Sequence, residues 1–365
     1  MKRFLIILLK YVAPLAIVAW LIHSTAADAS FEALWTQPKH WGLLAAAAFV
    51  SFCGVALTFV RWYFLVKALD LPFRLRDAFR LGFLGYLFNF IAPGAVGGDL
   101  FKAVFIAREQ PGRRAAAISS VIVDRLVGLL ALLMLASVVF LATGVGDEAR
   151  HGQFRVPCFI VWAVTIGSTL LSLAFMIPAL TDGAFAKRIE SIRRVGPLIA
   201  QFHHAVRMYR RRPSILLLSL VLSLGVHSLT SVAYYLIAKA LPGQAPTLAA
   251  TFIIAPLSIL VGILPVMMNG LGVVEGAMKI LYAQVPSGLP AGVVVTAGLG
   301  LLVSLTNRLI MILIASIGAI YYLFRRREVA VLIHAAEAGP PAPEPSGAAA
   351  AAAEFRPGPS SQLAM

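Results

Sequence analysis

Three acidic residues lie within or beside long apolar runs of the sequence, where charged side chains are rare. They are Asp99, Asp124 and Glu275, out of sixteen acids in the whole chain. Lys102, Arg125 and Lys279 stand within four residues of these acids, and Arg308 lies in the next long apolar run after Glu275. Ionisable groups at membrane depth cost several kcal/mol unless they are paired or wetted, so each one is a candidate functional group.

Two interpretations of these charges stay open. In the first, they form structural ion pairs that hold helices together, Asp99 or Asp124 with Arg125 and Glu275 with Arg308. In the second, Arg125 and Arg308 face a shared cavity and bind a phosphate, because a guanidinium offers a planar, permanently charged fork. The acids then orient the arginines or carry protons.

The same charges border two interrupted apolar segments, 81–98 and 252–284. Proline, glycine and asparagine break both segments. Such breaks free backbone groups that hydrocarbon cannot hydrogen-bond, so they persist only where protein or a water-filled cavity takes over the bonding. Half-helices that begin near Gly97 and Gly270 would aim their positive N-terminal ends at a bound anion. The sequence therefore predicts a substrate-binding site formed by Asn89, Pro93, Gly97, Gly98, Asp99, Lys102, Asp124, Arg125, Asn269, Gly270, Gly272, Glu275 and Arg308.

The composition identifies the solvent of this chain. Its 365 residues are 60% hydrophobic and 13% charged, which is more apolar side chain than a soluble domain buries. The mean hydropathy of +0.87 agrees, and we expect an all-α polytopic membrane protein. The net charge of +15 falls in short inter-helix segments with no nucleic-acid-reading module beside them, so anionic lipid headgroups explain it better. Cys53 and Cys158 give no disulfide or metal spacing.

About six continuous runs are long enough to cross a bilayer of roughly 30 Å. They are residues 4–22, 41–69, 115–143, 156–180, 215–240 and 293–324. The first resembles a secretory signal, but its length favours an uncleaved helix. Basic residues concentrate between the second and third runs, in 181–213 and at 325–327, which predicts cytoplasmic termini in an inner membrane by the positive-inside rule.

The two interrupted segments read as re-entrant hairpins from opposite sides of the membrane. Basic residues flank 81–92 on both sides, whereas the flanks of 252–284 carry little charge. Asp124-Arg125 follows the first segment and Asn307-Arg308 follows the second, each in a long apolar run. This order is typical of an inverted repeat with broken helices, an architecture of transporters. A hairpin that crosses the membrane completely remains an alternative.

The remaining expectations concern structure. We expect Arg61 to snorkel to the interface and His227 to be a hydrogen-bonded core residue. Residues 183–212 have the pattern of a basic amphipathic segment on the cytoplasmic leaflet. The membrane domain should comprise residues 1–327, and residues 328–365 have the composition of a disordered cytoplasmic tail.

Four stretches together resemble the family of lysylphosphatidylglycerol synthase transmembrane (flippase-like) proteins. They are "NFIAPGAVGGDLFKA", "SSVIVDRLVGLLAL", "LPVMMNGLGVVEGA" and "TNRLIMIL", and the resemblance spans roughly residues 5–325. It implies a membrane unit that moves lipids across the bilayer. Because only a short polar tail follows Arg327, we expect a stand-alone member without the soluble aminoacyltransferase domain. Met267-Met268-Asn269 departs from relatives, which leaves the lipid specificity open. Because stand-alone members of the family include one associated with hopanoid biosynthesis, the resemblance admits a hopanoid or polyprenyl lipid as well as a phospholipid.

Two function classes follow. The first is a lipid flippase or transporter for an anionic or isoprenoid-type lipid. The second is an integral membrane enzyme, or an accessory factor, in the biosynthesis of lipids, hopanoids or lipid-linked glycans. No phosphotransferase, protease or zinc motif occurs in the sequence, so we expect no enzyme activity, no cofactor and no metal. The expected partner is a membrane lipid and not a nucleic acid, and homo-oligomerisation stays open.

Overall fold

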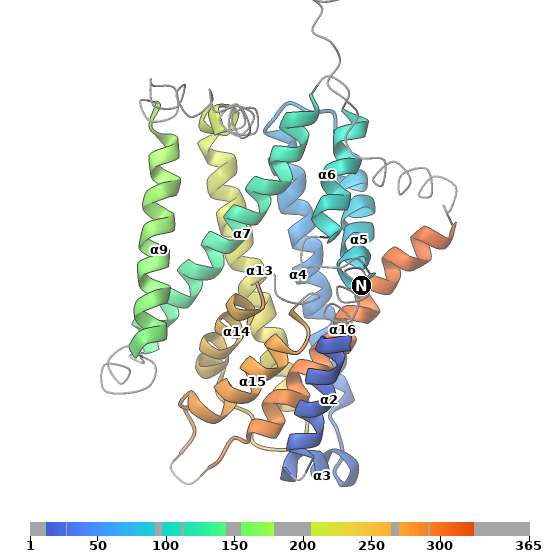
Figure 1. The fold of residues 1–365 in the computed structure, drawn as a ribbon, viewed down its shortest axis with the longest axis vertical. Coiled ribbons are helices and arrows are strands. Elements are labelled where there is room, and N and C mark those ends of the chain that lie inside the picture. The colour runs from blue at the N-terminus through green and yellow to red at the C-terminus, as the bar shows by residue number, and fades with distance from the viewer. Residues whose placement is uncertain are drawn as a thin grey trace, which may run out of the picture. The chain divides into compact units, whose positions relative to one another are not determined.

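The computed structural model describes residues 12–26, 28–91, 97–110, 113–143, 155–178, 206–263, 270–290 and 293–324 (Figure 1). All regular secondary structure in these ranges is helical, as expected for an all-α protein. The chain divides into two compact units, 1–325 and 326–365, and every described residue belongs to the first. The predicted tail at 328–365 lies outside the described residues.

Eleven helices of the first unit have described bounds, and residues 206–210 are helical as well. The eleven helices are α2 (Ala13–Thr25), α3 (Ala29–Thr36), α4 (Trp41–Lys67), α5 (Leu75–Ile91), α6 (Gly97–Glu109), α7 (Arg114–Thr143), α9 (Arg155–Met176), α13 (Pro213–Ala240), α14 (Leu248–Gly262), α15 (Val273–Gln284) and α16 (Ala297–Phe324).

Four of these helices are long and apolar enough to cross a membrane: α4, α7, α13 and α16. At about 1.5 Å per residue, their 27 to 30 residues exceed a hydrocarbon core of about 30 Å. Four of the six expected spans therefore match long apolar helices. Within the described residues, the other two match the shorter apolar helices Leu15–Thr25 and Cys158–Ala174.

The long helices expose apolar side chains and bury polar ones. Large exposed hydrophobic residues include Leu141 on α7, Leu217 on α13 and Leu313 on α16, whereas Ser219 and Ser223 are buried on α13. This arrangement reverses that of a water-soluble bundle and suits a hydrocarbon solvent.

Helices α5 and α6 form the first hairpin and run antiparallel. An ion pair joins Arg80 and Glu109 at its open end, with Nη2 and Oε1 2.5 Å apart. At its closed end the backbone N–H of Gly98 donates to Asn89 Oδ1 over 3.0 Å. This antiparallel course agrees with the predicted break, because α5 runs to Ile91 and α6 begins at Gly97 and returns along it.

Helices α14 and α15 form the second hairpin in the same way. At the open end the backbone N–H of Thr247 donates to the carbonyl of Ser287 over 2.9 Å. At the closed end Gly270 and Gly272 have φ angles of 66° and 84°, a left-handed conformation that side chains other than that of glycine rarely adopt. These two glycines form the turn that leads into α15, which begins at Val273.

The first half of the fold comprises helices α4, α5, α6 and α7, and the second half comprises α13, α14, α15 and α16. The helix contacts of these two halves correspond to each other. Helix α6 packs on α7 and α15 packs on α16, while α5 packs on α16 and α14 on α7. The first helices of the two halves, α4 and α13, pack against one another. Figure 1 shows the α5–α6 hairpin in the upper part of this unit and the α14–α15 hairpin in the lower part. Each hairpin is therefore held partly by the long helix of the other half.

Candidate functional site: two charge clusters beside the hairpins

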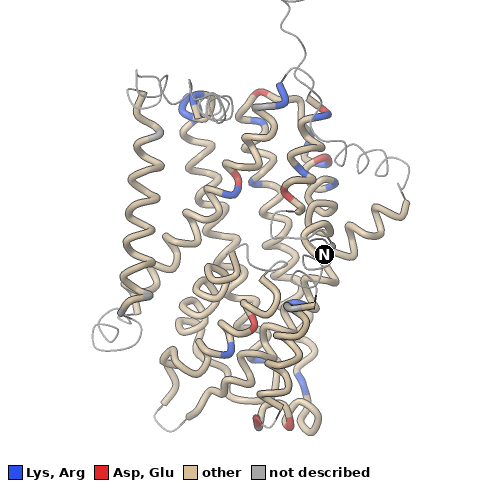
Figure 2. Tube along the Cα trace, viewed as in Figure 1, with Lys and Arg blue, Asp and Glu red and all other residues tan. Residues whose placement is uncertain are grey.

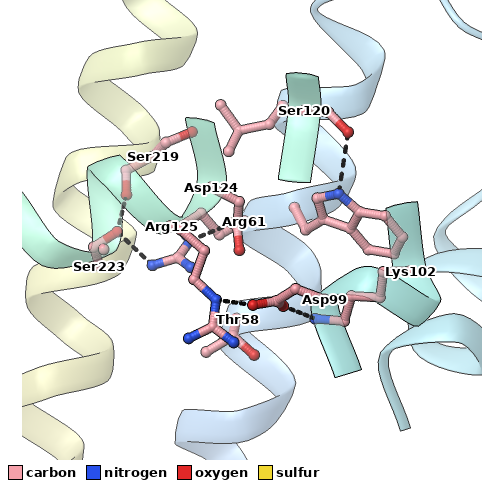
Figure 3. Close-up of polar contacts among 12 residues, drawn as sticks. Thr58, Arg61, Asp99, Lys102, Ser120, Asp124, Arg125, Ser219 and Ser223 are labelled. Atoms are coloured by element: carbon pink, nitrogen blue, oxygen red, sulfur yellow. Dashed lines mark hydrogen bonds and ion pairs between the residues drawn. The ribbon is translucent and has the colours of Figure 1, made fainter. Parts of the chain in front are cut away.

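The first charge cluster consists of Arg61, Asp99, Lys102, Asp124 and Arg125, shown in Figure 3. Asp99 lies in the first turn of α6 and forms an ion pair with Arg125 Nε on α7. Its other carboxylate oxygen lies 3.9 Å from Lys102 Nζ, one turn further along α6. Asp99 therefore bridges two cations from adjacent helices.

Asp124 pairs with Arg61 and not with Arg125. Arg61 Nε donates to Asp124 Oδ1 over 2.7 Å, and its Nη1 donates to Ser223 Oγ on α13 over 2.8 Å. The two charged side chains are only 7% and 10% exposed. The expectation that Arg61 snorkels is therefore wrong, because α7 and α13 supply buried partners that a sequence does not reveal.

Lys102 lies against aromatic rings in the interior of the protein. Its Nζ is 5.7 Å from the ring centre of Phe59 and 5.4 Å from that of Trp62, both on α4. Cation–π contacts of this kind stabilise an ammonium group that has lost water. Trp62 is itself fixed, because its Nε1 donates to Ser120 Oγ on α7 over 3.3 Å.

The second charge cluster consists of Glu275 and Arg308. Arg308 Nε on α16 donates to Glu275 Oε1 over 2.5 Å. Glu275 Oε2 accepts a 2.7 Å hydrogen bond from the backbone N–H of Gly272 and so caps α15. The Glu275 side chain is fully buried and that of Arg308 is 16% exposed. Lys279 turns away from this cluster and donates to Ser24 Oγ on α2.

The two clusters have matching positions in the two halves. Asp99 is the third residue of α6, and Glu275 is the third residue of α15. Each pairs with an arginine on the long helix that follows. The residue just before each arginine contacts the first helix of its half. Asp124 pairs with Arg61 on α4, and Asn307 Nδ2 donates to the hydroxyl of Tyr234 on α13.

Not every predicted site residue has a place in these clusters. Asn89 closes the first hairpin, and Gly270 and Gly272 form the turn of the second. Pro93 and Asn269 lie outside the described residues. Within the described ranges no hydrogen bond or ion pair joins the two clusters, so a shared cavity stays a prediction.

The sequence pointed to Asp99, Lys102, Asp124, Arg125, Glu275 and Arg308 but missed Arg61 and Tyr234. Arg61 was available as an arginine inside an apolar run, yet its partners are Asp124 and Ser223, far away in the sequence. Tyr234 gives no signal in an apolar helix. His227 is a hydrogen-bonded interior residue as expected, with Nε2 3.0 Å from the carbonyl of Gly128.

The described end of the basic segment 183–212 differs from a helix that lies on lipid. The hydroxyl of Tyr209 donates to the carbonyl of Leu65 over 3.0 Å, and both Val206 and Tyr209 are buried. Its apolar residues here pack on the end of α4. The rest of the segment, up to residue 205, lies outside the described residues.

Replacing Gly98 with alanine should destabilise the first hairpin. An added Cβ would lie 2.0 Å from the backbone oxygen of Gly85 and 2.6 Å from Asn89 Oδ1. Overpacking of this kind typically costs about 1 to 3 kcal/mol. We expect a lower thermal midpoint for the purified Gly98→Ala protein.

Gly167→Ala on α9 is the matched control, because a Cβ there meets nothing within 4 Å. An unchanged midpoint for Gly98→Ala would mean that α5 and α6 are not packed this closely.

Comparisons with known proteins give a match over most of the chain. Residues 6–314 match the family described as lysylphosphatidylglycerol synthase TM region. A UPF0104 membrane protein from Methanothermobacter thermautotrophicus is 23% identical over 259 residues, which is 65% of this chain and 74% of that protein. No solved structure matches.

Proposed function

We propose, from the premise that the chain belongs to the lysylphosphatidylglycerol synthase TM region family, that it moves an anionic or isoprenoid-type lipid across the bacterial inner membrane. One observation carries the proposal: an arginine on a long helix meets an acid at the start of a broken half-helix, once in each half of the chain. A lipid phosphate that leaves water must exchange hydration for fixed donors, which arginine supplies.

The correspondence of helix contacts supports an inverted repeat. Broken helices near the midplane, taken from two inverted halves, are where transporters bind their substrates. The hairpins α5–α6 and α14–α15 would then be re-entrant from opposite sides, with their closed ends reaching into the membrane. In each, a half-helix N-terminus would contribute positive potential beside an arginine.

The distribution of basic residues supports an orientation. Figure 2 shows Lys and Arg gathered at the end of the unit where α4 ends and α5, α7 and α13 begin. By the positive-inside rule this end would face the cytoplasm, together with both termini. The α2–α3 connection and the acids Asp28 and Glu32 would face the other side.

Cysteine labelling tests this orientation and the first hairpin together. Single cysteines at the exposed positions Arg76 and Arg108, in a protein that lacks Cys53 and Cys158, should react with an impermeant reagent from the same side of inverted vesicles. A cysteine at Glu32 should react only from the opposite side. Reaction of positions 76 and 108 from opposite sides would make the hairpin a full crossing and undercut the inverted repeat.

A reconstitution experiment tests the function itself. The purified protein in liposomes with headgroup-labelled phospholipid, polyprenyl phosphate or a hopanoid should speed movement of one of these lipids between leaflets. Chemical analysis of the recovered lipid should show no modified headgroup. A modified lipid without faster movement would favour the alternative, an integral membrane enzyme or accessory factor in lipid biosynthesis. The Gly167→Ala protein is the control variant and should move lipid as fast as the unchanged protein.

A further inference from the structure

The two arginine–acid pairs differ sharply in their access to the surroundings. The Arg125 side chain is 55% exposed, whereas that of Arg308 is 16% exposed. Asp99 pairs with Nε of Arg125, and among the residues that the structure describes no hydrogen bond or ion pair involves the two terminal nitrogens of that guanidinium. Because these nitrogens carry most of the donors of the fork, Arg125 keeps its capacity to bind an anion.

The two clusters also differ in charge. The first contains three cations, Arg61, Lys102 and Arg125, and two anions, Asp99 and Asp124, which leaves a net charge of +1. The second contains one cation and one anion, Arg308 and Glu275, and is neutral. A single negative charge would therefore neutralise the first cluster, and no ligand charge is needed by the second.

The surface beside Arg125 is apolar. Ile118, Ile122 and Leu126 are exposed large hydrophobic residues that follow one another at intervals of four along α7. Arg125 lies three residues after Ile122, so it shares this face of the helix. Leu100, next to Asp99 on α6, is also exposed. The charged guanidinium of Arg125 thus lies beside a row of apolar side chains that favours contact with hydrocarbon.

From the exposure of Arg125, the net charge of its cluster and the apolar surface beside it, we propose that an amphiphile with one phosphodiester charge enters the first cluster sideways from the membrane, across the face of α7. This proposal rests on the proposed function and specifies how that function begins. The phosphodiester binds the free terminal nitrogens of Arg125, and an acyl chain lies along Ile118 and Ile122. Asp99 holds the guanidinium by Nε and so orients its free side toward the ligand.

The chemistry separates this ligand from a free phosphate. Inorganic phosphate carries between one and two negative charges near neutral pH, makes no use of the apolar strip and arrives from water. A phosphodiester lipid has one charge, which matches the surplus of the cluster, and its chains replace membrane lipid along α7 at little cost. The second cluster, closed and neutral, would accept the headgroup only after a rearrangement.

The test uses the full-length protein in nanodiscs that contain phosphatidylcholine and a small fraction of a photoactivatable phosphatidylglycerol. We expect cross-links on the part of α7 that contains Ile118 and Ile122, and about a ten-fold lower yield there in Arg125→Gln. Arg108→Gln removes an exposed cation from α6 outside the cluster and should leave the yield unchanged. Inorganic phosphate at millimolar concentration should not compete.

Three results would overturn the proposal: equal yields in Arg125→Gln and the unchanged protein, cross-links confined to α15 and α16, or full competition by inorganic phosphate. These results are distinguishable from a failure of the proposed function. A protein that moves lipid in liposomes but is cross-linked only near Arg308 keeps the function and loses this entry route. A protein with the α7 cross-link and no lipid movement loses the function and keeps the binding site.

Discussion

Replacing Arg61 with methionine should destabilise the protein by about 3 to 5 kcal/mol, the largest stability loss that we expect from one substitution. The reason is that Asp124, 10% exposed, would keep its charge without its partner. Ser223 would also lose a donor, because Arg61 Nη1 is the group that reaches it. The measurement is the thermal midpoint and the yield of folded protein in detergent, compared with the unchanged chain.

Two further variants show whether the loss comes from the unpaired charge. The double variant Arg61→Met with Asp124→Leu removes both charges and should regain most of the stability, since apolar replacement of a buried pair is often neutral. Asp70→Asn weakens the exposed pair of Asp70 with Arg212 and should cost at most about 1 kcal/mol. If Arg61→Met lowers the thermal midpoint no more than Asp70→Asn does, the Arg61–Asp124 ion pair contributes little to the stability of the packing of α4 on α7.

Replacing Arg125 or Arg308 with lysine should reduce lipid transport at least about ten-fold while the protein stays folded. Lysine keeps the positive charge but cannot reproduce the planar fork that holds an acid and a phosphate together. Losing one charge-assisted hydrogen bond costs about 1.5 to 3 kcal/mol, which corresponds to ten-fold or more in binding. The measurement is the rate of lipid movement in liposomes per correctly folded molecule.

Lys279→Arg is the matched control for this pair. Lys279 lies on the same helix as Glu275 but faces Ser24, so the reverse exchange there should leave transport unchanged. Normal transport by both lysine variants would rule out the phosphate-binding interpretation. If instead the lysine variants lose folded protein in proportion to transport, Arg125 and Arg308 act only as structural partners of Asp99 and Glu275.

Local sequence patterns predict much of the fold. The four long apolar helices follow from runs of apolar residues, because hydrocarbon demands an unbroken helix of sufficient length. The turn before α15 follows from glycine, which adopts the φ of 66° found at Gly270 without strain. The pairing of Glu275 with Arg308 could be anticipated, since an acid buried in an apolar environment needs a cation.

Other features of the site depend on which helices become neighbours. Arg125 and Asp124 are adjacent in the sequence, but a helix turns successive side chains about 100° apart, so they face different helices. Only the packing of α7 between α6 on one side and α4 and α13 on the other sends Arg125 to Asp99 and Asp124 to Arg61. Packing also decides that Asn89 Oδ1 accepts from the Gly98 backbone at the closed end of the hairpin, while its ligand role stays a prediction.

The difference between the two halves is also a tertiary property. By sequence alone, Asp124-Arg125 and Asn307-Arg308 are near equivalents, and nothing local distinguishes the exposure of their arginines. In the folded chain the Arg308 side chain on α16 is largely buried beside α15, whereas more than half of the Arg125 side chain on α7 is exposed. Residue type determined that each half would carry a paired arginine, because unpaired charge is costly in an apolar solvent. Helix packing decided which arginine remains accessible, because exposure depends on neighbours distant in the sequence.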